Sequence, residues 1–159
     1  DDVESRGLGD VYKRQVAAQS GKLDVVQEQI LADFKAANLN PNVTDNFLGT
    51  LYTKVVFNSV INTICTLFEI RMGQFIDYQG AEKLGRQLID EAYDVAELAG
   101  IEPLNSREKE WGSIRYVSEE TSPLYYPSMY QDMIKGRQTE VDYINGYVYD
   151  LGLANGYQA

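Results

Sequence analysis

The feature that most constrains the fold is the run over residues 46–68, which contains no proline and is apolar at most positions. Among its polar residues, one lysine and two asparagines recur at four-residue steps: Lys54, Asn58 and Asn62. In a helix of 3.6 residues per turn, these positions form one slowly drifting stripe about 12 Å long. The run therefore predicts a central helix over 46–68 with a polar stripe along an otherwise apolar surface.

The polar stripe needs an explanation, because the same helix places apolar side chains on its other sides: Val55, Phe57, Val60, Ile61 and Ile64. Burying an asparagine amide without a partner costs about 1–3 kcal/mol, and an unpaired ammonium costs more. Two interpretations stay open at this point. The three polar groups bond the neighbouring backbone or face water, or they line a groove that holds a small polar ligand.

Helical periodicity also describes the segment before this run. Its apolar residues recur at three- and four-residue steps: Leu23, Val26, Ile30 and Phe34. This spacing predicts a helix over 22–38 with one apolar face. The segment LNPNVTD follows, and its proline favours extended backbone. Either Thr44 or Asp45 is in place to cap the helix over 46–68.

The rest of the chain predicts helices. A helix over 79–98 has an apolar face, and Gly100 follows as its stop. The inward positions of this helix are Leu84, Leu88, Ile89, Ala92, Val95 and Ala96. Shorter patterns predict helices over 107–117, 128–137 and 140–152, with Ser128 as the cap of the second. No strand is strong enough to build a sheet, so the predicted fold class is mainly α, and all-α from residue 46 onward.

Composition excludes several classes of protein. The chain has 159 residues, 44% of them hydrophobic, which suits one globular domain or one domain and part of another. A net charge of −10 argues against a nucleic-acid partner, and no apolar run reaches the ~20 residues of a membrane span. The chain has no histidine and one cysteine, Cys65, so we expect no metal site and no disulfide framework. A reduced, cytoplasmic location follows most simply.

The amino-terminal segment over 1–15 shows neither helical nor strand periodicity and no apolar core of a signal peptide. Within it, GLGDVYKRQ resembles translated library-adapter sequence, which predicts that the segment is not native. A flexible native terminus is the alternative. Either interpretation leaves this segment outside the predicted fold.

A second polar cluster lies near the carboxy terminus, in the pattern SMxQDxxxGRxTExDxINGxV that begins at Ser128. Together with KxxxNxxxN in the helix over 46–68 and EAYDVAELAG ending at Gly100, it resembles the carboxy-terminal helical domain of the ketopantoate reductase (2-dehydropantoate 2-reductase) family. The similarity extends from about Gly21 to Tyr157. It is specific, because two motifs agree both in internal spacing and in their separation along the chain.

The resemblance implies an NADPH-dependent enzyme that reduces 2-dehydropantoate to pantoate, with an amino-terminal Rossmann domain and a helical domain that closes over the substrate. Lys54 matches the family's catalytic lysine, Asn58, Asn62 and Ser128 its substrate-binding residues, and Glu140 a glutamate near the cofactor ribose. One departure is Met72, where some members have a polar substrate contact. The resemblance also implies a homodimer formed through the helical domain.

The residue types at these positions suit the reduction of a ketone. Hydride addition leaves a developing alkoxide, for which a lysine ammonium supplies a proton and a positive charge. We expect Lys54 to be desolvated by neighbouring apolar side chains, while Asn58 and Asn62 orient the substrate oxygens by neutral hydrogen bonds.

No GxGxxG motif follows a strand in this sequence, so we expect most of the cofactor site to lie outside it. Residues 16–45 would be the terminal helix and strand of the Rossmann domain, and 46–159 the helical domain, truncated at its carboxy terminus. Such a fragment is expected to be inactive alone.

Two other functions stay open. In the first, the chain is part of a reductase of another 2-keto acid, which Met72 favours. In the second, it is a non-catalytic helical module whose Trp111 and tyrosines bind a partner.

Overall fold

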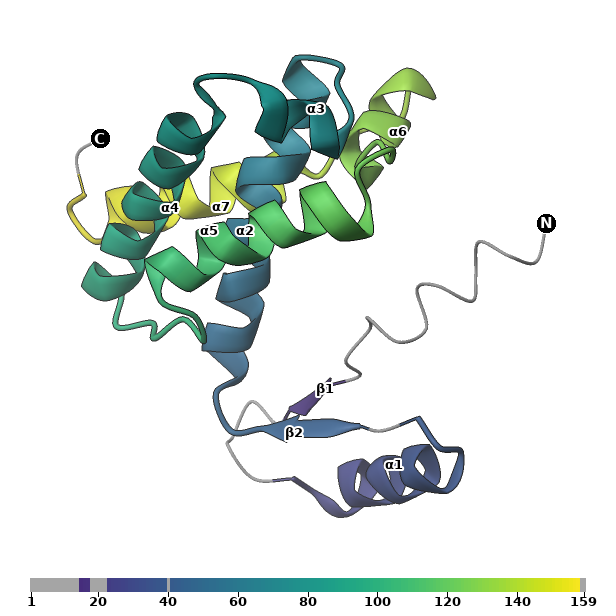
Figure 1. Ribbon diagram of the computed structural model, residues 1–159. Coiled ribbons are helices and arrows are strands. Elements are labelled where there is room, and N and C mark those ends of the chain that lie inside the picture. Colours follow the sequence, from purple (N-terminus) through teal and green to yellow (C-terminus); the bar gives the residue numbers. More distant parts are fainter. Residues whose placement is uncertain (1–14, 18–22, 40, 158–159) are drawn as a thin grey trace. The chain divides into compact units, whose positions relative to one another are not determined.

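The computed structural model describes residues 15–17, 23–39 and 41–157, and residues 1–14 of the amino-terminal segment lie outside this part. The chain divides into two compact units, residues 1–50 and 51–159. The labels in Figure 1 follow the chain from β1 to α7.

The first unit is a strand, a helix and a second strand: β1 (Gln15–Ala17), α1 (Val25–Ala36) and β2 (Asn42–Thr44). The two strands pair in parallel, with Val16 opposite Val43. A helical crossover between parallel strands is the β-α-β arrangement of α/β proteins. Strand β2 lies within the extended segment that was predicted around Pro41. The pairing corrects the expectation that no strand would build a sheet, because β1, of three residues, is too short to show an alternating pattern.

Helix α1 begins at a capping box. The Asp24 carboxylate accepts from the Gln27 backbone N–H at 2.8 Å, and the Gln27 side chain accepts from the Asp24 N–H at 2.9 Å. The helix ends two residues earlier than predicted, and Asn38 adopts a left-handed φ of 56°. None of its side chains is buried, and Val26 of the predicted apolar face is 66% exposed. The two-stranded sheet is too small to cover that face.

Helix α2 (Phe47–Leu67) confirms the long helix predicted from the apolar run. Its cap differs from the two residues predicted. The Asn46 side chain accepts from the Gly49 N–H at 2.8 Å, while Thr44 accepts from the N–H of Asn46 itself at 3.2 Å. The helix therefore begins one residue later than expected, because the side chain of Asn46 reaches the third amide of the first turn.

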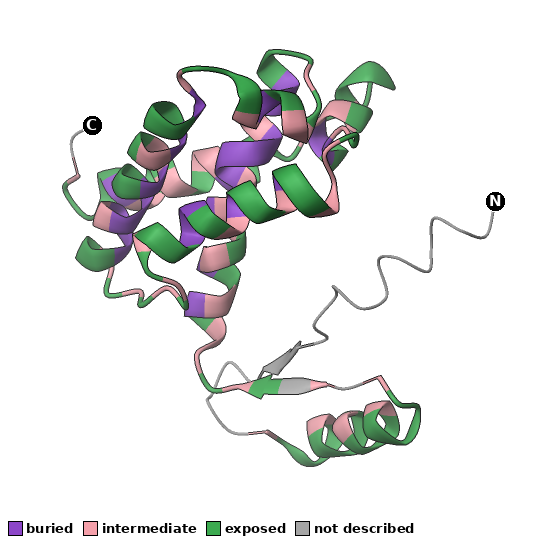
Figure 2. Cartoon of the chain, in the orientation of Figure 1, coloured by how far each residue is buried: buried purple, intermediate pink, exposed green. Residues whose placement is uncertain are grey.

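In the second unit, α2 runs through the centre of the helical domain (Figure 1), and most of its length is coloured as buried or intermediate in Figure 2. Its buried core residues lie on several sides of the helix, while the exposed Lys54 lies near its amino end. The buried ones are Tyr52, Val56, Val60, Ile61, Ile64 and Cys65. They pack against Phe75, Ile89 and Trp111 from three other helices. The central position predicted for this helix is thus confirmed.

Five further helices and one π-helical turn complete the second unit. These are α3 (Met72–Asp77), α4 (Ala81–Leu98), α5 (Arg107–Tyr116), η1 (Val117–Thr121), α6 (Ser128–Ile134) and α7 (Val141–Ala154). The expected stop at Gly100 is confirmed by its φ of 68°. Ser128 was predicted as a cap but is the first residue of α6 and makes no capping hydrogen bond, because Pro127 occupies the cap position. Helix α3 was not predicted.

Two of the six inward positions predicted for α4, Leu84 and Leu88, are not buried. Ile89, Ala92, Val95 and Ala96 are buried as expected, whereas Leu84 is 37% exposed and Leu88 packs at the edge of the core. Gly85 takes the buried place beside Leu84. Among the described residues, no helix combines the length and the apolar character needed to cross a membrane.

Candidate active site

The polar stripe of α2 becomes more buried toward the carboxy end of the helix. Lys54 is exposed, Asn58 is half-buried, and Asn62 is only 6% exposed. The expected desolvation of Lys54 is therefore wrong for this structure, because the lysine lies on the open side of the helix. The two asparagines lie one and two turns further along the same side.

The candidate side chains of the stripe have no partners in the protein. Within the described residues, no hydrogen bond or ion pair is made by the side chains of Lys54, Asn58 or Asn62. Asn62 is 6% exposed as a whole residue, but its amide atoms are not among the described polar atoms that are buried without a partner, which are Thr66 Oγ1 and Ser118 Oγ. The Asn62 amide therefore keeps contact with solvent and is accessible to a ligand.

The other two candidate residues begin neighbouring helices. Ser128 is the first residue of α6, and Glu140 is at the cap position of α7. Both side chains are exposed, and no hydrogen bond connects either of them to the α2 stripe in the described part of the chain. Ser128 offers a hydroxyl that donates or accepts, and Glu140 a carboxylate that accepts.

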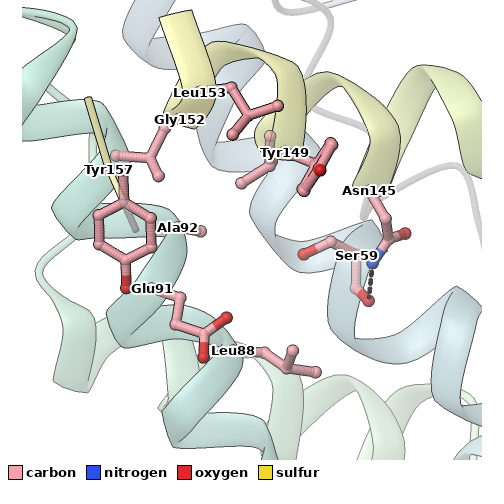
Figure 3. Close-up of a pocket in the computed structure, with 11 residues that line it drawn as sticks. Ser59, Leu88, Glu91, Ala92, Asn145, Tyr149, Gly152, Leu153 and Tyr157 are labelled. Carbon is pink, nitrogen blue, oxygen red and sulfur yellow. Dashed lines mark hydrogen bonds between the residues drawn. The ribbon is translucent and has the colours of Figure 1, made fainter. Parts of the chain in front are cut away.

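Helix α7 is tied to α2 by Asn145. The Thr63 hydroxyl donates to Asn145 Oδ1 at 2.6 Å, and Asn145 Nδ2 donates to the Ser59 carbonyl at 3.2 Å. Figure 3 shows Asn145 reaching from α7 to Ser59 on α2. The sequence placed Asn145 in the second polar cluster without giving it a contact. Its partners lie 82 and 86 residues away, so no local pattern could reveal them.

The approach to α6 is held against α3. The backbone N–H of Met72 donates to the Tyr125 carbonyl at 3.1 Å, and the Arg71 guanidinium lies 5.6 Å from the centre of the Tyr126 ring. Tyr126 stacks in turn on Tyr130 of α6 at 4.4 Å. Met72 itself packs against the hydrophobic core. Met72 thus presents a half-buried apolar side chain at the position where the resemblance raised a polar contact to the substrate.

A pocket of about 390 Å³ lies between α2, α4 and α7. In Figure 3, the carboxylate of Glu91 and the ring of Tyr157 lie on one side of it and Asn145 on the other. None of the five predicted site residues lines this pocket. The stripe of α2 and this pocket are therefore different surfaces of the helical unit.

The described residues offer no alternative centre of chemistry at a thiol or a metal. Burial raises the pKa of the Cys65 thiol to about 12, which keeps it protonated and unreactive. No group of three or more cysteine, aspartate or glutamate side chains within the described ranges is arranged to hold a metal ion. The unpaired groups of α2 remain the strongest candidate for a site.

A β-α-β unit followed by a unit of packed helices defines the class: an α-helical domain in one chain with a β-α-β unit. Its central helix carries a lysine and two amides without partners among the described residues. The family follows from the sequence. Residues 46–159 match the family model described as ketopantoate reductase PanE/ApbA C terminal. The chain belongs to this family.

Curated relatives agree with the family. The 2-dehydropantoate 2-reductase of Streptococcus pyogenes serotype M3 is 31% identical over 119 residues, which are 73% of this chain and 37% of that protein. That of Aquifex aeolicus is 30% identical over 141 residues, 86% of this chain and 44% of that protein. The chain thus spans about two fifths of the length of these relatives.

Solved structures agree with the fold. A ternary structure of D-mandelate dehydrogenase with NADH and anilino(oxo)acetate has a TM-score of 0.80 and 26% identity, covering 91% of this chain and 59% of that one. A PanE/ApbA family ketopantoate reductase from Ralstonia eutropha has a TM-score of 0.78 at 24% identity, covering 92% and 47%, which supports the fold alone.

Proposed function

We propose that this chain is the helical domain of an NADPH-dependent reductase that converts 2-dehydropantoate to pantoate. The observation that carries the proposal is the set of unpaired groups on α2, where Lys54, Asn58 and Asn62 share one side of the helix in a member of this family. We further propose that it acts with a cofactor-binding domain in the same polypeptide. A homodimer and a cytoplasmic location belong to the same proposal.

Lys54 acts as the general acid. When a nicotinamide cofactor is bound, it supplies a hydride to the carbonyl carbon of the substrate. The electron pair of the C=O bond moves to the oxygen, and the Lys54 ammonium gives that oxygen a proton, which leaves a hydroxy acid and a neutral amine. Its positive charge also stabilises the oxyanion as it forms. Because Lys54 is exposed, water can return the proton before the next cycle.

The asparagines orient the substrate. Each carboxamide both donates and accepts, so Asn58 and Asn62 can bond the keto oxygen and the hydroxyl of 2-dehydropantoate without adding charge. The gradient of burial along α2 places the neutral Asn62 in the driest part of the stripe and the charged Lys54 in the wettest. This order suits the solvation of each group. Ser128 donates a hydrogen bond to one carboxylate oxygen of the substrate.

The residues present fit one part of a nicotinamide dinucleotide. Glu140 is an exposed carboxylate that makes no side-chain hydrogen bond within the described residues, and a carboxylate suits the hydroxyls of a ribose. Glu140 would hold that part of the cofactor by accepting two hydroxyl hydrogens. Its place at the start of α7 leaves both carboxylate oxygens free for this.

A second candidate is the reductase of a different 2-keto acid. Met72 is half-buried against the core and offers no polar group to the substrate. The D-mandelate dehydrogenase structure with the similar fold was solved with a 2-oxo acid derivative bearing an aromatic group. Both observations favour a substrate less polar than 2-dehydropantoate. The catalytic role proposed for Lys54 is the same in either case.

The test is NADPH oxidation by the complete reading frame that contains these residues, with 2-dehydropantoate as substrate. Lys54→Ala is expected to lower kcat at least about a hundredfold, the effect of losing a general acid. Lys83→Ala is the matched control, because Lys83 is also an exposed helical lysine without an ion pair among the described residues. It should keep the parent rate.

The substrate panel separates the two candidates. A faster rate with the 2-keto acid of mandelate than with 2-dehydropantoate would support the second. If the folded protein binds NADPH but reduces no 2-keto acid, the proposal of a reductase is wrong. Equal rates for Lys54→Ala and Lys83→Ala would remove Lys54 from the chemistry.

A further inference from the structure

We propose that Asn145 is a positioning residue, which holds the polar stripe of α2 in register with Glu140 at the start of α7. The inference rests on the proposed reductase function and extends it to a residue that touches neither substrate nor cofactor. We call Asn145 with its two partners, Ser59 and Thr63, the α2–α7 clamp.

The clamp is a two-way bridge. Asn145 Oδ1 accepts from the Thr63 hydroxyl at 2.6 Å while its Nδ2 donates to the Ser59 carbonyl at 3.2 Å. One carboxamide therefore bonds two neighbouring atoms of α2, because the Ser59 carbonyl points along the helix toward the turn that carries the Thr63 hydroxyl. A single hydrogen bond would allow α2 to pivot about it, whereas two points fix both the height and the rotation of one helix against the other.

The two points gripped are next to the substrate stripe. Ser59 directly follows Asn58, and Thr63 directly follows Asn62. Successive residues of a helix point about 100° apart, so the clamp holds a face of α2 beside the one that presents the asparagines. Turning α2 about its axis would swing both amides, and the clamp opposes that turn.

Apolar packing and the clamp restrain α7 in different ways. Ile144 and Gly152 of α7 are buried, Val148 and Leu151 pack half-buried against the core, and the Tyr147 ring meets Tyr52 of α2 edge-on. Apolar contacts hold α7 against the domain but are non-directional. The two hydrogen bonds of Asn145 are directional, so they set the register of α7 against α2.

The position of α7 matters because Glu140 begins it. Glu140 lies five residues before Asn145, about 7.5 Å along the helix axis at 1.5 Å per residue. A shift of α7 along α2 would move Glu140 by the same amount against Lys54 and the asparagines. A misplacement of about 1 Å can cost about a hundredfold in rate.

The experiment measures kcat and KM for reduction of 2-dehydropantoate, and of the 2-keto acid of mandelate, in the complete reading frame. The variants are Asn145→Ala, Thr63→Val, Thr63→Ser and the double variant of the first two. Thr63→Val removes one hydroxyl with little change of shape, so it keeps the test readable if Asn145→Ala does not fold. Asn155→Ala is the control, because the Asn155 amide also donates to a helical carbonyl, that of Leu151, within α7 itself.

We expect kcat to fall at least about tenfold in Thr63→Val and in Asn145→Ala, measured well below each variant's unfolding temperature. Thr63→Ser should return to within about threefold of the parent, because serine keeps the donor. The double variant should be no slower than Asn145→Ala, since the two residues act as one unit. Asn155→Ala should match the parent.

A purely structural role would lower the unfolding temperature of Thr63→Val and Asn145→Ala while leaving kcat and KM of the folded protein within about twofold, and that result would overturn the inference. Independent, additive losses would also overturn it. The unmutated protein reports on the proposed function separately. If it reduces no 2-keto acid, both proposals fail, whereas an active parent with unaffected variants removes the clamp alone.

Discussion

Gly85 of α4 lies directly against the indole ring of Trp111 of α5. A Cβ at residue 85 would overlap Trp111 Cζ3, so glycine is the residue that lets the two helices approach this closely. Trp111 is 3% exposed and meets the Phe75 ring edge-on, with the ring centres 6.4 Å apart. The contact joins α3, α4 and α5 around one aromatic side chain.

Gly85→Ala is therefore expected to destabilise the domain. Overpacking costs about 1–3 kcal/mol, which outweighs the gain of up to about 1 kcal/mol from replacing a glycine within a helix. Gly112→Ala is the control, because Gly112 lies in α5 with nothing within 4 Å of its would-be Cβ. Urea unfolding should show opposite signs for the two variants. A stabilised Gly85→Ala would mean that Trp111 moves aside freely.

Glu110 predicts a pH dependence of stability. It is 1% exposed, and burial raises the pKa of its carboxyl, against the opposing effects of a hydrogen bond from Asn105 and the charge of Lys109. A folded pKa above the unfolded value of about 4.5 means that its contribution to stability is full below pH 4.5. That contribution is lost as the pH rises through the folded pKa.

Glu110→Gln should remove this part of the pH dependence. Thermal unfolding of parent and variant from pH 4 to pH 8 measures it, because other titrating groups are common to both. The variant should gain stability relative to the parent as the pH rises. Parallel curves would show that Glu110 does not titrate differently in the folded protein.

Tyr52 ties α2 to α4 through a buried hydrogen bond, from its hydroxyl to the Ala92 carbonyl at 2.6 Å. Tyr52→Phe should lower the free energy of unfolding by about 0.5–1.5 kcal/mol, the net value of such a bond. Tyr147→Phe is the control, because the Tyr147 ring meets Tyr52 edge-on but Tyr147 is 42% exposed. If Tyr52→Phe and Tyr147→Phe lower the free energy of unfolding equally, the hydrogen bond from Tyr52 to Ala92 does not stabilise the fold.

Replacing Asn62 should lower activity without lowering stability. Because its amide makes no hydrogen bond within the described residues and keeps contact with solvent, Asn62→Leu is expected to leave the free energy of unfolding unchanged or to raise it. The same change should lower kcat/KM for the 2-keto acid at least about tenfold. Asn105→Leu should instead destabilise the fold, since Asn105 donates to buried Glu110 at 2.8 Å. A lower free energy of unfolding in Asn62→Leu would show that Asn62 stabilises the fold and would contradict its proposed role in binding the substrate.

Much of the helical unit could be predicted from periodicity. The apolar run gave α2 to within a residue or two at each end, and Gly100 marked the end of α4 through its left-handed backbone. Caps were predicted less well. Thr44, Asp45 and Asn46 are all good capping residues, and only the geometry of the turn selects Asn46.

Other features had little local signal. Pro41 indicated the extended segment of β2, but β1 is three residues long and is defined by its parallel pairing with β2. Helix α3 is a single short helix whose start is held by the segment before α6, through the bond from Met72 to Tyr125. The exposure of Lys54 also escaped prediction, because apolar neighbours in sequence point to other sides of a helix.

The sequence by itself determined the longer helices, the polar stripe and the family, because periodicity and motif spacing are properties of neighbouring residues. Only the tertiary structure decided how far each group of the stripe is buried. It also decided that Asn145 of α7 bonds α2, while the side chains of the stripe make no hydrogen bond within the described residues. Burial and pairing depend on side chains brought together from distant parts of the chain, as the contact from Asn145 to Ser59 shows. Such contacts leave no pattern within any one segment.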